Sequence, residues 1–225
     1  MQLLLEQIRE LGSQRPEAPA ITFVDDHGEI TESMSRADLV TDMGTVADFL
    51  RQRCDLVPGD RAVLVYPPGL DFVRSLIGCI AAGVLPVAVY PPDPLTPHTS
   101  MKHLQRVAAD CGARAVLTNQ AYADARQFGS AESAKAGHQV DWPTQIAWHI
   151  TPSDRPRDDA GFAPPRVSDW NPGPEVPAFL QYTSGSTSAP KGIIVTHANL
   201  AHQMDFLHRN LRYSVDSRAV LWLPV

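Results

Sequence analysis

Three stretches of almost uninterrupted apolar residues, at 61–66, 84–90 and 113–118, constrain this chain more than any other feature of its sequence. Such a stretch suits a β-strand that is covered on both faces. The segments between them carry apolar residues at helical spacing, among them Phe72 and Leu76. Strands that alternate with helices form parallel sheets with right-handed crossovers. The expected fold is therefore α/β, with a mostly parallel sheet flanked by helices.

Further elements are expected before this core. A short amphipathic helix precedes Gly12, and a second helix has its apolar stripe between Leu39 and Leu50. Residues 20–24 and 29–34 should pair as a hairpin, because Asp and Gly residues fill the turn between them. The chain thus begins with a helix, a hairpin and another helix.

The later part of the chain is less regular. Residues 143–177 are rich in proline and lack periodicity, so they are expected to form an irregular surface segment. Thr196 is the expected N-cap of a helix over residues 197–211. Tyr66 and Tyr90 each precede a proline pair, and both are expected to pack at the ends of strands.

Composition excludes several classes of function. The formal net charge is −6 and the 19 basic residues are scattered, which argues against a nucleic-acid surface. There is no secretory leader and no apolar stretch long enough to span a membrane, so a soluble cytoplasmic protein is expected. Cys54, Cys79 and Cys111 lie far apart and suit reduced thiols better than a disulfide framework. The histidine spacing predicts no metal site.

The sequence LQYTSGSTSAPKGIIVTH, residues 180–197, places a small polar loop between two apolar runs. Its hydroxyl groups and unhindered backbone N–H groups can surround an anion, and Lys191 adds a flexible positive charge. Pro190 stiffens the loop. This is not a Walker A loop, because Pro190 and Gly192 flank the lysine and the next segment is a strand. A flexible Gly/Ser linker is the alternative, although linkers rarely lie between two strongly apolar runs.

The loop resembles the phosphate-loop signature of the adenylate-forming superfamily, which includes acyl-CoA synthetases, peptide-synthetase adenylation domains and fatty acyl-AMP ligases. Ser188 departs from the glycine that most of the superfamily has, and this position is more variable in fatty acyl-AMP ligases. Residues 58–94, with the elements YPPG and YPPDP, are also similar to the N-terminal block of that branch. Gln181, before the tyrosine, is typical of the same branch.

The resemblance implies that the chain is the N-terminal part of the large domain of a fatty acyl-AMP ligase. Members of that branch use ATP and Mg²⁺ to convert a fatty acid into an acyl adenylate, and then transfer the acyl group to an acyl carrier protein or polyketide synthase. Carried over by position, the phosphate-binding residues are Thr183, Ser184, Gly185, Ser186, Thr187 and Lys191. The rest of the large domain, the C-terminal domain and the catalytic residues are expected beyond Val225, so the 225 residues alone should not complete adenylation.

Two other functions remain open at this stage. The same fold could serve a long-chain acyl-CoA synthetase, or the chain could be a non-catalytic module that binds ATP or a partner. Asn199 and His202, on the helix after the loop, could line an acyl tunnel, but capping and solvated roles are the expected ones. An incomplete sheet should also expose an apolar edge, which predicts self-association.

Overall fold

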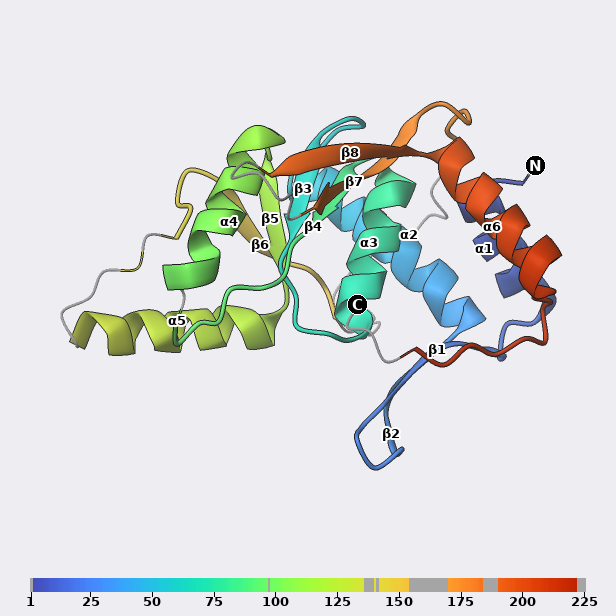
Figure 1. Cartoon of the computed structure of the whole chain (residues 1–225), viewed down its shortest axis with the longest axis horizontal. Helices are drawn as coiled ribbons and strands as arrows, with labels where there is room; N and C mark the ends of the chain where they lie inside the picture. The colour runs from blue at the N-terminus through green and yellow to red at the C-terminus, as the bar shows by residue number, and fades with distance from the viewer. Residues whose placement is uncertain are drawn as a thin grey trace.

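The computed structural model describes residues 2–96, 98–135, 140, 142–153, 170–183 and 190–221. The helices are α1 (Leu4–Gln14), α2 (Arg36–Gln52), α3 (Leu70–Ala82), α4 (His98–Asp110), α5 (Gln120–Lys135) and α6 (His197–Leu211). The strands are β1 (Pro19–Val24), β2 (Ile30–Ser35), β3 (Arg61–Leu64), β4 (Leu85–Ala88), β5 (Ala115–Thr118), β6 (Ala147–Ile150), β7 (Pro177–Thr183) and β8 (Lys191–Thr196). Figure 1 shows their arrangement.

A six-stranded sheet forms the centre of the fold, with the order β6-β5-β3-β4-β7-β8. Its strands pair in parallel, except that β8 runs antiparallel to β7. The strands β1 and β2 form a separate antiparallel hairpin. The predicted α/β fold with a mostly parallel sheet is confirmed, as is the hairpin near the N-terminus.

The two faces of the sheet bury different clusters, because successive side chains of a strand point to opposite faces. Leu64 and Leu117 belong to the cluster that also holds residues of α2 and α3, and both are fully buried. Val63 and Val116 face the other way, into the cluster with Leu104 of α4. Burial on both faces explains why these strands read as continuous apolar runs in the sequence.

Close contact between α2 and α3 depends on a glycine. A Cβ atom added at Gly78 would lie 2.4 Å from Cβ of Val46, well inside van der Waals contact. The N-terminus of α2 is fixed by a capping box, in which Asp38 N–H donates to Ser35 Oγ and Ser35 N–H donates to the Asp38 carboxylate. The glycine thus permits the close approach of the two helices, and the capping box fixes where α2 begins.

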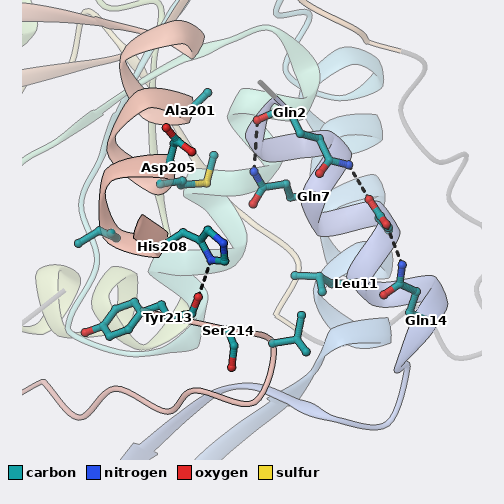
Figure 2. A pocket seen from close by; sticks show the side chains of 13 residues that line it. Gln2, Gln7, Leu11, Gln14, Ala201, Asp205, His208, Tyr213 and Ser214 are labelled. Atoms are coloured by element: carbon teal, nitrogen blue, oxygen red, sulfur yellow. Dashed lines mark hydrogen bonds between the residues drawn. The ribbon is translucent and has the colours of Figure 1, made fainter. Parts of the chain in front are cut away.

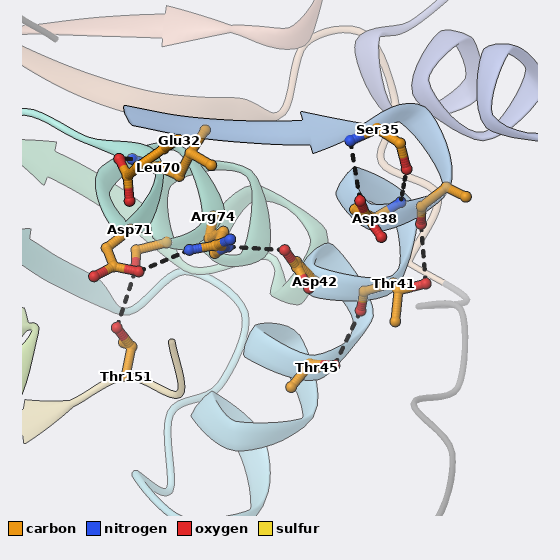
Figure 3. A network of polar contacts seen from close by, with 12 residues as sticks. Glu32, Ser35, Asp38, Thr41, Asp42, Thr45, Leu70, Asp71, Arg74 and Thr151 are labelled. Carbon is orange, nitrogen blue, oxygen red and sulfur yellow. Dashed lines mark hydrogen bonds and ion pairs between the residues drawn. The ribbon is translucent and has the colours of Figure 1, made fainter. Parts of the chain in front are cut away.

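A network of polar groups joins the same two helices, as Figure 3 shows. Arg74 of α3 donates to Asp42 of α2 at 2.8 Å and to Asp71 at 2.9 Å. Burial raises the pKa of the Asp42 carboxyl, and the guanidinium of Arg74 opposes that rise. Arg74 thus pairs with both Asp42 and Asp71. Ion-pair networks of this kind perturb pKa values without any catalytic role.

Three predictions about this part of the molecule need correction. The helix α5 was not expected, and residues 147–150 of the supposedly irregular segment form β6, which pairs with β5. Tyr66 is buried as predicted, and its hydroxyl lies 2.9 Å from Thr151 Oγ1. Tyr90 is 76% exposed, so its predicted packing role is wrong.

Within the described residues, no helix is both long and apolar enough to cross a membrane.

Candidate nucleotide-phosphate site

The polar loop that the sequence singles out connects two adjacent antiparallel strands. Thr183, the last residue of β7, pairs with Lys191, the first residue of β8. The other predicted phosphate-binding residues, Ser184, Gly185, Ser186 and Thr187, lie outside the described residues. The two strands predicted on either side of the loop are therefore confirmed, and Thr183 and Lys191, the first and last members of the predicted set, lie opposite each other.

The loop lies at the edge of the sheet where ligands of α/β proteins usually bind. Because β7 is parallel to β4, its last residue, Thr183, is at the same edge as the carboxyl ends of β3, β4, β5 and β6. Open α/β sheets bind ligands outside the carboxyl ends of their strands. The position of the loop in the fold thus agrees with a ligand-binding role.

Both described members of the predicted site face solvent. The side chains of Thr183 and Lys191 are exposed, and Lys191 makes no ion pair within the described part of the chain. An ammonium group of this kind can neutralise an incoming polyanion without first breaking an internal contact. The described residues contain no cluster of three or more histidine, cysteine, aspartate or glutamate side chains that could hold a metal ion.

The base of the loop is anchored by a tyrosine. Tyr182 pairs with Gly192 across the hairpin, and its hydroxyl donates to the carboxylate of Asp110 on α4. Burial raises the pKa of Tyr182, and so does the adjacent Asp110 carboxylate, which keeps the phenol in its donor form. A Cβ atom at Gly192 would lie 2.8 Å from Cζ of Tyr182, so a larger residue would disturb the ring.

This anchor is a role that the sequence alone did not reveal. From the sequence, neither Tyr182 nor Gly192 is assigned a role of its own. A hairpin register that pairs Thr183 with Lys191 also pairs Tyr182 with Gly192. The spacing of the two strands in the sequence could therefore have indicated this contact. Asp110 is distant in the sequence, and no pattern there indicates its contact with Tyr182.

The helix after the loop begins as predicted. Thr196 is its N-cap and accepts a hydrogen bond from the backbone N–H of Asn199 at 3.2 Å. The Asn199 side chain accepts in return from the backbone N–H of Thr196, and His202 is exposed. Their expected capping and solvated roles are confirmed. His197 is 1% exposed, and its Nδ1 has no hydrogen-bond partner within the described residues.

A cavity of about 520 Å³ lies elsewhere, between α1 and α6, and is shown in Figure 2. Its walls include Leu11 and Met204, together with the acidic side chains of Glu10 and Asp205. No lysine or arginine lines it. The two carboxylates would repel a phosphate group and no lysine or arginine lines the cavity to offset them, so the charge of this cavity is unfavourable for a nucleotide.

The comparison with protein families defines the class of protein to which this fold and loop correspond. Residues 8–225 match the model of the family described as AMP-binding enzyme, and the chain belongs to that adenylate-forming family. Among its relatives, the medium-chain-fatty-acid-[acyl-carrier-protein] ligase JamA of Moorena producens is 30% identical over 206 residues, covering 91% of this chain and 32% of the relative.

A second curated relative gives a similar picture. The long-chain-fatty-acid-AMP ligase FadD26 of Mycobacterium marinum is 29% identical over 230 residues, covering 97% of this chain and 36% of the relative. The chain spans about a third of the length of these curated relatives.

Solved structures agree with the family assignment. The fatty acyl-adenylate ligase from L. pneumophila, in complex with acyl adenylate and pyrophosphate, has a TM-score of 0.73 and 25% identity, covering 95% of this chain and 34% of that chain. A fatty acyl-adenylate ligase structure from a study of the E. coli and L. pneumophila enzymes has a TM-score of 0.74 at 22% identity, covering 100% of this chain and 37% of that chain, and it shows the shared fold alone.

Proposed function

We propose that the chain is part of an ATP-dependent ligase that activates a fatty acid as an acyl adenylate and transfers it to an acyl carrier protein or polyketide synthase. The single observation that carries the proposal is the hairpin register that pairs exposed Thr183 with exposed Lys191 at the carboxyl edge of a parallel sheet. The relatives named as fatty-acid-AMP and fatty-acid-[acyl-carrier-protein] ligases support the choice of substrate.

The chemistry explains why such a loop is needed. A carboxylate is a poor electrophile, and attack of its oxygen on the α-phosphate of ATP gives a mixed anhydride with a good leaving group. During this step the departing pyrophosphate must be held and its negative charge neutralised. The hydroxyl of Thr183 would donate to a phosphate oxygen, and the ammonium of Lys191 would approach the β- and γ-phosphates.

The predicted Mg²⁺ is compatible with this donor set. Mg²⁺ is usually bound through substrate phosphates and only one or two carboxylates. The ion would therefore enter the site on the triphosphate. When bound there, Mg²⁺ would neutralise part of the charge on the phosphate oxygens.

The proposal is tested by the affinity of the 225-residue protein for ATP in the presence of Mg²⁺, measured by isothermal titration calorimetry. Lys191→Ala should weaken ATP binding about tenfold or more, the loss expected for a charge-assisted contact of roughly 1.5 kcal/mol or above. Lys102→Ala, on the exposed surface of α4, is the matched control and should bind as the wild type does. Equal affinities of Lys191→Ala and wild type would refute the assignment of the loop.

The proposed division of the enzyme is tested by catalysis. Because the chain spans about a third of its relatives, we propose that the catalytic residues lie outside these 225 residues. The purified chain should therefore show no pyrophosphate exchange with fatty acid and ATP. Exchange at the rate of a complete ligase would contradict this part of the proposal.

Two alternatives have support in the comparisons. The hypothesis of a fatty-acid-CoA ligase is favoured by a Mycobacterium tuberculosis relative named putative fatty-acid-CoA ligase FadD21. This relative is 28% identical over 232 residues, covering 98% of this chain and 37% of the relative. Product analysis of the complete protein, with coenzyme A and carrier protein offered together, separates the two ligase activities.

The hypothesis of a binding module is prompted by the similarity to human Disco-interacting protein 2 homolog A, whose name describes a protein interaction. It is 29% identical over 183 residues, covering 81% of this chain and 11% of the relative. A complete protein that binds ATP without forming an acyl adenylate would support this reading over both ligases.

We also propose that the chain self-associates through the edge of the sheet. β8 is the last strand of the described sheet, and Ile193 and Ile194, on its two faces, are 49% and 60% exposed. Unpaired strands with exposed apolar side chains pair readily with other chains. Sedimentation velocity over a range of concentrations should show dimers or larger species. A monomer at all concentrations would refute this contact.

A further inference from the structure

The cavity between α1 and α6 has a lining that the chemistry of the loop does not use. Its volume of about 520 Å³ falls within the range of about 300–1,000 Å³ that is usual for small-molecule sites. Figure 2 shows Leu11 and Gln14 of α1 on one side of it, and Asp205 and His208 of α6 on the other. The segment 213–215, which follows α6, adds a third wall. Three separate segments of the chain thus bound the cavity.

A carboxylate on α1 is held in place by neutral donors. The Nε2 atoms of Gln2 and Gln14 donate to the two carboxylate oxygens of Glu10, at 2.6 Å and 2.7 Å. These amides orient the carboxylate, but they add no positive charge to it. Glu10 makes no ion pair within the described part of the chain. Its negative charge is therefore available to a ligand.

The wall formed by α6 carries a second carboxylate, that of Asp205. Arg209 donates to it from Nε at 2.9 Å, but this arginine does not line the cavity and its side chain is 74% exposed. Apolar side chains from both helices, among them Leu11, Met204 and Leu207, also line the cavity. The cavity thus combines apolar surface with one carboxylate on each of the two helices.

Other polar groups of the lining can accept hydrogen bonds. Nδ1 of His208 lies 2.6 Å from the backbone oxygen of Tyr213. Because a carbonyl can only accept, Nδ1 carries the proton, and Nε2 of the neutral ring is left as an acceptor. Gln2 and Gln14 use Nε2 to hold Glu10, so their Oε1 atoms are left as acceptors too. An ammonium group has three donors and no acceptor, and this lining complements it.

We propose that the cavity binds an aliphatic diamine or polyamine, in which methylene groups separate ammonium groups. One ammonium group would donate to Glu10 and a second would approach Asp205, since a cation that leaves bulk water needs such partners. The methylene groups would contact apolar side chains such as Leu11 and Met204. The inference goes beyond the proposed ligase function and does not depend on it, because none of these residues belongs to the loop.

Three probes of similar length separate charge from apolar contact. They are diaminooctane, with an ammonium group at each end, octylamine, with one ammonium group, and octanediol, with none. Their affinities for the 225-residue protein are measured by isothermal titration calorimetry at low ionic strength, because salt screens exposed charges. Glu10→Gln and Asp205→Asn each remove one charge with little change of shape. Glu29→Gln, in the exposed turn between β1 and β2, is the matched control, since it removes the same charge away from the cavity.

The wild type should bind diaminooctane about tenfold or more tightly than octanediol, with octylamine between them. Glu10→Gln should weaken the binding of diaminooctane about fivefold, and Asp205→Asn about twofold, because Arg209 already offsets the charge of Asp205. Both variants should keep the wild-type affinity for octanediol, and Glu29→Gln should bind all three probes as the wild type does. Far-ultraviolet circular dichroism verifies that each variant is folded.

Three results would overturn the proposal. If diaminooctane binds no more tightly than octanediol, the carboxylates do not select a cation. If Glu10→Gln and the wild type bind diaminooctane equally, the diamine lies elsewhere. If Glu29→Gln weakens binding as much as Glu10→Gln does, the attraction is that of the whole acidic protein. None of these results affects the proposed function, which is tested by the dependence of ATP binding on Lys191.

Discussion

The two halves of the sheet differ in how far helices cover one of its faces. In β3 and β5, Leu64 and Leu117 are fully buried under α2 and α3. In β7 and β8, side chains on the same face, such as Gln181 and Ile193, remain exposed. The covered half stabilises the fold through burial of apolar side chains. The open half contributes less to stability, and its side chains are available for contacts outside the described structure.

Replacing one large side chain by alanine in each half tests this difference most strongly. Leu64→Ala should lower the free energy of unfolding by about 3 kcal/mol, because it removes buried methyl groups and leaves a cavity. Ile193→Ala, on the open half, should change it by no more than about 0.5 kcal/mol. Urea unfolding followed by circular dichroism measures both. Equal losses in the two variants would show that the halves do not differ in this way.

The contact between α2 and α3 offers a second test of the covered half. Gly78→Ala should destabilise the protein by about 2 kcal/mol, because the added methyl group collides with Val46. Val46→Ala in the same chain should recover part of the loss by making room. Gly173→Ala is the control, since a Cβ atom there meets only Val176 at 4.0 Å. Additive losses from Gly78→Ala and Val46→Ala would contradict the proposed collision.

The junction of β8 with α6 should make stability depend on pH. Burial lowers the pKa of His197 below the ordinary value of 6.5, so the unfolded chain binds a proton more readily than the folded one. Stability is then fully present above about 6.5 and is lost as the pH falls below it, by at most about 1.4 kcal/mol per pH unit.

His149 has its pKa lowered for the same reason and adds to the trend. His197→Leu should flatten the dependence of unfolding free energy between pH 7 and pH 5. The exposed His202→Leu should leave the slope unchanged. An unaltered slope in His197→Leu would assign the acid sensitivity to other groups.

The smallest expected effect concerns the anchor of the loop. Tyr182→Phe removes the hydrogen bond to Asp110 but keeps the ring over Gly192. Because Tyr182 is only partly buried, the loss of stability should be about 0.5–1 kcal/mol, measured by thermal unfolding. Asp110→Asn, which still accepts a hydrogen bond, should lose less. A larger loss in Asp110→Asn than in Tyr182→Phe would mean that Asp110 stabilises the fold in another way.

The sequence predicted the parallel core because burial on both faces leaves continuous apolar runs that few other structures produce. It missed α5, whose residues 120–135 have little apolar periodicity because the helix buries only a narrow strip that includes Tyr122. It missed β6 because prolines surround a four-residue strand, and strand pairing is a tertiary contact that local composition does not encode.

The candidate site was predictable in part, because some of its features are local in the sequence. The polar composition of the loop and the order of strand, loop and strand were visible in the residues. The exposure of Tyr90 was not, because a tyrosine before two prolines fits a packed and a solvated strand end equally well. Which helices cover which half of the sheet depends on contacts between distant segments, so the exposed face of β7 and β8 could be recognised only in the folded structure.

The hydrogen bond from Tyr182 to Asp110 has a consequence for the geometry of the hairpin. It fastens the base of the hairpin to α4 on one side, while the missing side chain at Gly192 gives the ring clearance on the other. A base that is held on both sides keeps Thr183 and Lys191 opposite each other, so the two described ends of the loop stay in a fixed register.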